Sequence, residues 1–168
     1  PSPMVATVDS VLQSSSPRTA TPTVDLPRAT LIGDSIMQGA APMIEDVLGE
    51  DVYIDAARKR KMEDVPALVK TLSKEVVVIH LGSNRPFEDP VFDAVMEALL
   101  AHDVERVIFI NVHRPIGWEY YLNQKFTEGV ARWPQAELID WDAMEIASGS
   151  AIKITWNGEL VGLVDQDR

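Results

Sequence analysis

The sequence predicts an α/β protein of three layers, α/β/α, in which helices cover both faces of a five-stranded parallel sheet. Short apolar runs alternate along the chain with segments whose apolar residues recur at helical spacing. Residues 76–81 form a largely β-branched run, which is typical of a central strand buried on both faces. Strands that alternate with helices are joined by right-handed crossovers, so we expect the strands to run parallel.

Five strands and four helices are expected in order along the chain. Each strand is a short apolar or β-branched run, and the five runs are residues 29–32, 52–54, 76–81, 106–110 and 136–140. Each helix shows apolar residues three or four positions apart, and the four segments are residues 43–48, 65–72, 91–100 and 122–130. After Trp141 the pattern weakens, although residues 151–156 and 160–164 are consistent with two strands joined at a turn signal, Asn157-Gly158.

Residues 1–28 differ from the rest of the chain in composition. Half of them are Pro, Ser or Thr, and residues 14–23 show no apolar periodicity. Such a segment buries too little apolar surface to offset its chain entropy, so we expect a linker. It lacks the basic start and apolar core of a signal peptide. We therefore expect a linker over 1–28 and a domain over 29–168, whose final part, 147–168, is atypical.

The composition excludes several classes of function. Among the 168 residues, Asp and Glu total 26 against 15 Lys and Arg, which gives a net charge of −11. Nucleic acid is therefore not an expected partner, because binding phosphates needs a basic face. The absence of cysteine rules out disulfides, cysteine-ligated zinc and thiol catalysis. The spacing of His and carboxylate residues matches no metal motif, and we expect neither a metal nor another cofactor.

Polar residues follow four of the expected strands at the point where each strand ends. They are residues 33–35, 55–61, 82–84 and 111–114. The carboxyl ends of parallel strands meet at one edge of a sheet, and open α/β sheets bind their ligands beyond that edge. We therefore expect the functional site there.

Ser35 and Asn84 are the leading candidates for catalysis at this edge. Ser35 lies where a strand passes into a helix, so its hydroxyl can face the crevice while its N–H lies at a helix N-terminus, which favours an oxyanion. Asn84 follows a neighbouring strand and can donate a second hydrogen bond to the same oxygen. The alternative is that Ser35 is a helix cap and Asn84 a turn residue. Either residue alone favours that alternative, whereas the pair favours a catalytic edge.

Two segments resemble signature blocks of the SGNH, or GDSL-type, hydrolases and acyltransferases. Residues 31–35, Leu-Ile-Gly-Asp-Ser, resemble the first block, and residues 78–84, Val-Ile-His-Leu-Gly-Ser-Asn, resemble the third. Together with residues 111–115 and 138–141, they are most similar to the extracytoplasmic domains of cell-wall (peptidoglycan) O-acetyltransferases. The resemblance implies a flavodoxin-like SGNH fold and an O-acetyltransferase or esterase activity.

The resemblance also implies roles for individual residues. Ser35 matches the family's nucleophile, and Asn84 matches a donor of its oxyanion hole. Lys59 stands near the small residue whose N–H completes that hole. The N–H is retained in lysine, but the side chain hinders close approach of the backbone. Asp34 is expected to bond to backbone groups of the edge.

Basic and aromatic residues near the edge are candidates for contacts with a glycan. Residues 58–61 are a basic run in an acidic chain, which is either a solvated loop or a contact for an anionic wall polymer. Within the site, Asp34, Arg60 and Arg114 are the candidate substrate-binding residues. Three aromatic residues either stack on a sugar or pack in the core, namely Trp118, Tyr120 and Tyr121.

The family's last block, Asp-x-x-His, has no match here. The best counterpart is residues 157–160, Asn-Gly-Glu-Leu, and no histidine follows His113 in the chain. A serine hydroxyl without a general base is a poor nucleophile at neutral pH. His113 is the histidine that could replace the missing base, whereas His80 is expected to be a buried, hydrogen-bonded core residue.

Two functions from different classes therefore stay open. Either the chain transfers or hydrolyses O-acetyl groups on cell-wall polysaccharide through Ser35, with activity impaired by the missing histidine, or it is a pseudoenzyme that binds glycan or docks on a membrane acyltransferase. In the resembling family the domain follows a membrane acyltransferase through a linker. The resemblance therefore implies an extracytoplasmic domain tethered to the cell membrane. We expect a monomer with a glycan and that acyltransferase as its partners.

Overall fold

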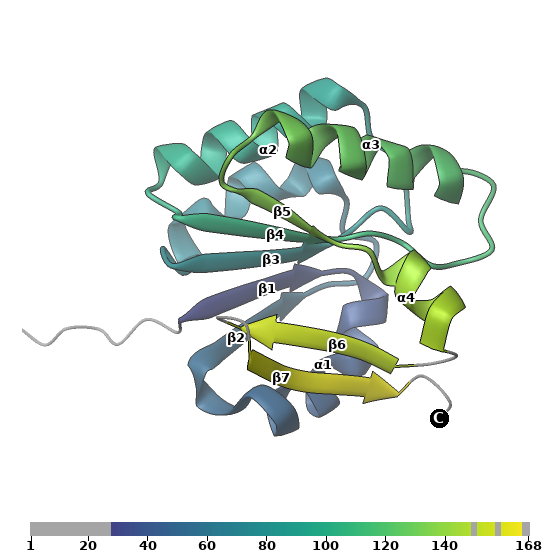
Figure 1. The fold of residues 1–168 in the computed structure, drawn as a ribbon. Helices are drawn as coiled ribbons and strands as arrows, with labels where there is room; N and C mark the ends of the chain where they lie inside the picture. The colour runs from purple at the N-terminus through teal and green to yellow at the C-terminus, as the bar shows by residue number, and fades with distance from the viewer. Residues whose placement is uncertain (1–27, 149–150, 157–158, 166–168) are drawn as a thin grey trace, which may run out of the picture.

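A five-stranded parallel sheet forms the centre of the molecule in a computed structural model, which describes residues 28–148, 151–156 and 159–165. The strands are β1 (Ala29–Gly33), β2 (Val52–Ala56), β3 (Val76–His80), β4 (Arg106–Ile110) and β5 (Ala136–Ile139). Their order across the sheet is β2-β1-β3-β4-β5, and every neighbouring pair is parallel (Figure 1). The predicted fold class and its five strands are confirmed.

Helices cover both faces of the sheet. One face carries α1 (Ser35–Leu48), which a short 3-10 turn, η1 (Gly49–Asp51), joins to β2, and α4 (Trp141–Ser148). The other face carries η2 (Met62–Thr71), α2 (Asp89–Ala101) and α3 (Glu119–Arg132). Figure 1 shows this division, with α2 and α3 on one side of the strands and α1 on the other.

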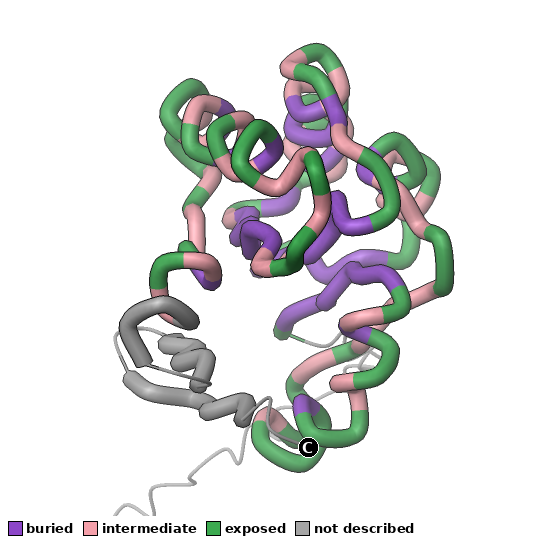
Figure 2. The backbone as a smooth tube through the Cα atoms, turned by 90° about the vertical axis from the view of Figure 1, so that its right-hand side faces the viewer, coloured by how far each residue is buried: buried purple, intermediate pink, exposed green. Residues whose placement is uncertain are grey.

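The strands read as continuous apolar runs because both of their faces are buried. Successive side chains of a strand point to opposite faces. Val77 and Ile79 accordingly join the core under α2 and α3, whereas Val76 joins the core under α1. Aromatic rings fill the larger core, and the centroids of Phe92 and Phe109 lie 4.5 Å apart. Figure 2 shows the buried residues gathered in the middle of the molecule.

The segment expected to be a helix over 65–72 forms the 3-10 helix η2 instead of an α-helix. Pro66 stands inside it, and proline has no N–H to donate to the carbonyl four residues earlier. The apolar face is kept in spite of this difference. Val65 is fully buried, and Leu68 and Val69 pack against the core under α2.

A separate antiparallel hairpin follows α4. Its strands are β6 (Ala151–Trp156) and β7 (Glu159–Asp165), as the two weak strand patterns predict. The hairpin lies beside α1 and α4, outside the parallel sheet (Figure 1). The turn expected at 157–158 lies outside the described residues, as does the linker expected over 1–28 apart from its last residue. Among the residues that the structure describes, no helix is both long and apolar enough to cross a membrane.

Candidate functional site at the carboxyl edge of the sheet

The strand order places the candidate residues at a topological switch point. After β1 the chain passes into α1 on one face, and after β3 it passes toward α2 on the other. Adjacent strands whose connections leave on opposite faces open a crevice at their carboxyl ends, where doubly wound sheets bind ligands. Ser35 follows β1, and Asn84 follows β3, so the two residues flank this crevice.

The carboxylate of Asp34 joins the segments that follow β1 and β3. Asp34 is fully buried and caps α1, because its Oδ1 accepts a hydrogen bond of 2.9 Å from the N–H of Ile36. Its Oδ2 accepts hydrogen bonds from the hydroxyl of Ser83 and from Nδ2 of Asn84, the latter at 3.2 Å. This carboxylate therefore serves as a scaffold of the site, and it has no exposed surface to offer a substrate.

Asn84 also reaches the segment that follows β2. Its Nδ2 donates to the carbonyl oxygen of Arg60 at 3.2 Å, in addition to its bond with Asp34. The structure thus brings together the three segments from which the resemblance draws an oxyanion hole. Because the amide has two hydrogens and each has an acceptor, Asn84 must release one of them before it can bind an oxyanion.

Ser35 is exposed at the first position of α1. Its own N–H belongs to the first turn of the helix, where backbone donors lack helical partners and the helix dipole favours negative charge. Within the described part of the chain, its hydroxyl makes no hydrogen bond, to an imidazole or to any other group. Ser35 is therefore accessible to a substrate, but no general base lies against it in this state.

Lys59 has a left-handed backbone, with φ of 64°. The N–H of Arg60 donates to the carbonyl of Ala57 at 3.2 Å, which closes a four-residue turn with Lys59 in its third position. A positive φ there is typical of a type II turn and favours glycine. The small residue that the resemblance expects near this position thus has a physical reason, and Lys59 occupies the position with strain.

The two arginines expected to touch substrate differ in their contacts. Arg60 is held by Asp55, with 2.7 Å between its Nη2 and Oδ1 of that carboxylate, and its side chain is only 11% exposed. It also donates to the carbonyl of Asp55. Arg114 is exposed, and its guanidinium makes no interaction with the described residues. Of the two guanidinium groups, Arg114 is therefore the one available to a ligand.

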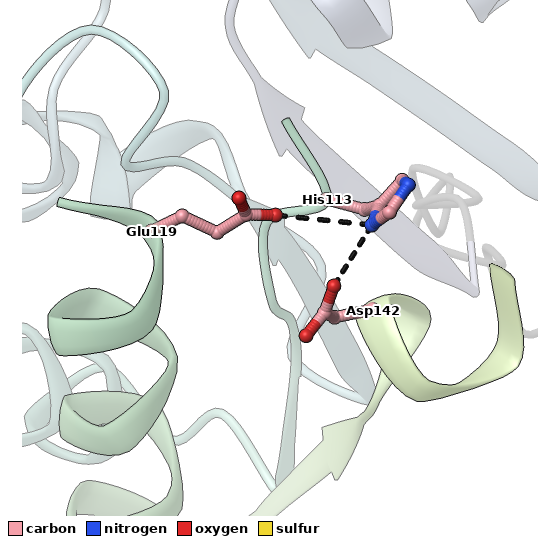
Figure 3. Close-up of side chains that lie close together, drawn as sticks. All are labelled: His113, Glu119 and Asp142. Carbon is pink, nitrogen blue, oxygen red and sulfur yellow. Dashed lines mark hydrogen bonds and ion pairs between the residues drawn. The ribbon is translucent and has the colours of Figure 1, made fainter. Parts of the chain in front are cut away.

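His113 belongs to a cluster at the other end of the same edge (Figure 3). Its Nδ1 lies 2.8 Å from Oδ1 of Asp142 and 3.8 Å from Oε1 of Glu119. Asp142 stands in the first turn of α4, after β5, and Glu119 begins α3. Sequence reasoning missed both carboxylates. The position of Asp142, directly beyond the carboxyl end of the fifth strand, was a usable signal for it, whereas no motif marks Glu119.

His80 lies behind this edge as a buried residue, as expected. It is 4% exposed, and burial lowers its pKa to about 4 against a smaller opposing effect of the charge on Asp34. Its ring lies 5.1 Å from that of Trp141, measured between centroids. The expected hydrogen bonding is not found at Nε2, which has no partner among the described residues. The apolar surroundings of the strand end explain both findings.

The comparisons with known proteins agree on the fold. No family model and no curated protein matches the sequence. Among solved structures, a Bacteroides fragilis protein named as an acylhydrolase matches with a TM-score of 0.54 and 16% identity, over 83% of this chain and 81% of its own. The C-terminal catalytic domain of Streptococcus pneumoniae peptidoglycan O-acetyltransferase A, solved with a methylsulfonyl adduct, matches with a TM-score of 0.56, 15% identity and the same coverages.

A third structure, a protein of Streptococcus pneumoniae described as a platelet activating factor, matches with a TM-score of 0.51 and 14% identity. It covers 84% of this chain and 74% of its own. At these identities the likeness concerns the fold, which is the SGNH-like α/β fold of acylhydrolase and O-acetyltransferase domains. The resemblance seen in the two sequence blocks is confirmed at that level.

Proposed function

We propose that this domain transfers or hydrolyses O-acetyl groups on carbohydrate, with the hydroxyl of Ser35 as the group that takes up the acetyl. The observation that carries the proposal is the hydrogen bond from Asn84, at the switch point of the sheet, to Asp34, the residue that precedes Ser35 at the start of α1. The likeness in fold to an O-acetyltransferase domain and to an acylhydrolase supports it.

The reaction proceeds by nucleophilic substitution at the ester carbonyl. Oγ of Ser35 bonds to the carbonyl carbon, and the bond from that carbon to the sugar oxygen breaks. The serine proton passes to a base and then to the departing sugar oxygen. In the second half, a sugar hydroxyl or a water molecule attacks acetyl-Ser35, and its proton returns to Ser35 by the same route. The developing oxyanion accepts hydrogen bonds from the N–H of Ser35, from the backbone N–H of Lys59 and from Asn84.

His113 is the proposed base. His80 is buried, and His102 ends α2 and so lies at the opposite edge of the sheet. His113 is half-buried at the carboxyl edge, and its Nδ1 is turned to carboxylates. It makes no hydrogen bond to Ser35, so the base must move toward the serine in each turnover. We therefore expect slow turnover relative to an enzyme with an assembled triad.

The proposed substrate is an O-acetylated cell-wall glycan outside the cytoplasm. The peptidoglycan O-acetyltransferase domain that shares the fold supports this choice. So do two exposed side chains: Arg114, which follows His113, offers a free guanidinium, and Tyr120, which follows Glu119 and is 86% exposed, offers an aromatic face on which a sugar can stack. A membrane acyltransferase domain in the same chain, joined through the linker, is the proposed partner. It would also tether the domain to the membrane.

A sulfonyl fluoride tests the nucleophile. Attack by Oγ of Ser35 on sulfur expels fluoride and leaves a stable sulfonyl ester, which peptide mass mapping assigns to one residue. We expect label on Ser35, and we expect Ser35→Ala to lower the hydrolysis of an aryl acetate by about 1,000-fold or more. Gln38→Ala, which replaces an exposed residue one turn further along α1, is the matched control and should retain full turnover. Equal turnover in Ser35→Ala and wild type would exclude the proposed nucleophile.

A non-catalytic glycan-binding domain is the second candidate. It is favoured by the two acceptors that occupy the amide hydrogens of Asn84 and by the lack of a hydrogen bond from the Ser35 hydroxyl to a base within the described residues. This function predicts that O-acetylated wall fragments bind to wild type and to Ser35→Ala with equal affinity. It also predicts that neither protein takes up the sulfonyl label. Labelling of Ser35 would rule it out.

A further inference from the structure

We propose that His113, Glu119 and Asp142 form a binding site for a divalent transition-metal cation of the Zn²⁺ type. The three residues come from three separate elements: the segment after β4, the first turn of α3 and the first turn of α4 (Figure 3). The inference goes beyond the proposed function and does not rest on it, since cation binding is measured without an ester substrate.

The geometry of the cluster suits a single ion. One ligand atom from each residue lies within 4.8 Å of the other two, and Nδ1 of His113 is 2.8 Å from Oδ1 of Asp142 and 3.8 Å from Oε1 of Glu119. Tetrahedral zinc with ligands at about 2.1 Å sets its donors about 3.4 Å apart. Side-chain adjustments of less than an ångström or so therefore bring the three atoms into one coordination sphere.

Protons alone leave the cluster incompletely paired. Two carboxylates face the same nitrogen, and that nitrogen carries at most one hydrogen, which the shorter distance assigns to Asp142. The ion pairs of Glu119 and Asp142 within the described residues are to His113 alone. Arg114, the nearest cation in sequence, forms no ion pair with either carboxylate. A dication in place of the proton binds the imidazole nitrogen and balances the negative charge of both carboxylates at once.

The ligand atoms are already oriented by neighbouring groups. Oε1 of Glu119 accepts a hydrogen bond of 2.7 Å from the N–H of Arg114. The buried amide of Asn111 holds the start of α4, because its Oδ1 accepts from the N–H of Asp142 at 3.1 Å and its Nδ2 donates to Asp140 at 2.8 Å. Such outer contacts fix ligand positions and strengthen metal binding.

The donor set selects the class of cation. An imidazole nitrogen favours Zn²⁺, Ni²⁺ or Fe²⁺ over Mg²⁺ and Ca²⁺, whereas two carboxylates are acceptable to all of them. The side chains of His113, Glu119 and Asp142 are 36%, 23% and 35% exposed, so an ion enters from solvent and keeps positions for water. Coordination at Nδ1 leaves the imidazole proton on Nε2. His113 therefore serves as a base only while the site holds no cation.

Titration with Zn²⁺ alone tests the proposal on the full chain, by calorimetry and by imidazole ¹⁵N NMR. We expect one site, and we expect the ¹⁵N signals of His113 to change while those of His102 do not. Asp142→Asn and Glu119→Gln keep the shape of each side chain and should each weaken binding about 100-fold. His113→Ala should abolish it. His102→Ala, which removes an imidazole at the opposite edge of the sheet, is the matched control and should bind as wild type does.

Three results would overturn the proposal. Wild type that binds no Zn²⁺ at millimolar concentration would exclude the site. Unchanged binding in His113→Ala would place the cation elsewhere on this acidic chain. Binding lost equally in His102→Ala would show non-specific association. None of these results bears on the sulfonyl label at Ser35, so failure of the metal site and failure of the proposed acetyl chemistry are distinguishable.

Discussion

The two ends of the carboxyl edge are built in different ways. Around Asp34, the carboxylate and Ser83 are buried, and together with the exposed side chain of Asn84 they form a hydrogen-bonded network that joins the segments after β1, β2 and β3. Around His113, the side chains are half-exposed, and two carboxylates share one nitrogen. At the Asp34 end, the hydrogen-bonding groups find their partners within the fold. At the His113 end, the described residues leave negative charge unbalanced.

This difference suggests that the Asp34 end contributes mainly to stability and the His113 end mainly to ligand binding. Removing a buried carboxylate that accepts from several donors costs stability, because those donors are left without a hydrogen-bond partner. Half-exposed ion pairs contribute little, because water screens them and side-chain entropy opposes them. We therefore expect mutations at the Asp34 end to act through unfolding and mutations at the His113 end to act through binding.

The largest effect is expected for Asp34→Ala. It leaves the buried hydroxyl of Ser83 and the half-buried N–H of Ile36 without their acceptor and removes one of the two acceptors of Asn84, so we expect a loss of about 3 kcal/mol in the free energy of unfolding. Asp142→Ala at the other end is the paired variant and should lose less than about 1 kcal/mol. Urea unfolding followed by tryptophan fluorescence measures both. Equal losses would mean that the two ends do not differ as described.

A dependence of stability on pH is the next expected effect, and it belongs to the buried Asp34 end. The folded pKa of His80 is lowered to about 4 from 6.5, mainly by burial. Between these two pH values the unfolded chain therefore binds a proton at His80 that the folded chain does not bind. The stability that His80 contributes is complete above pH 6.5 and falls as the pH drops toward 4, by about 3 kcal/mol in total.

Urea unfolding between pH 7 and pH 4 measures this slope in wild type and in His80→Leu, which cannot take up a proton. The variant should lose the part of the slope that belongs to His80, while His102→Ala should retain it. Identical slopes in wild type and His80→Leu would assign the acid sensitivity to other groups. The comparison isolates one buried imidazole from the many carboxylates of this acidic chain.

Most of the fold was predictable because burial on two faces leaves a plain signature. The run from Val76 to His80 and the alternation with helical spacing gave the strands and their parallel order. The Asp34 end was predictable in part for the same reason, since Ser35 and Asn84 come within four residues of the ends of β1 and β3, and the carboxyl ends of parallel strands share one edge. What the pattern could not show is the acceptor to which Asn84 donates, because that depends on side-chain rotamers and on the Arg60 carbonyl.

The His113 end was beyond sequence reasoning for a different reason. Its three members lie at positions 113, 119 and 142, and they meet only because the loop after β4, α3 and α4 pack at one corner. No fixed spacing along one helix or strand marks such a set. The 3-10 geometry of η2 was missed on local grounds, since the periodicity of its apolar face outweighed the signal of Pro66.

The smallest expected effect concerns the strained turn at the Asp34 end. Lys59→Gly removes the steric cost of φ at 64°, about 1–2 kcal/mol, and adds backbone entropy to the unfolded chain, so we expect a net gain of about 0.5–1 kcal/mol. Arg58→Gly is the control, because Arg58 precedes it in the same turn without a positive φ, and glycine there should cost a similar amount. Urea unfolding of the two variants should therefore shift in opposite directions. A loss of stability in both variants would show that Lys59 is not strained. The small residue expected at this position would then serve only to let a ligand approach the backbone.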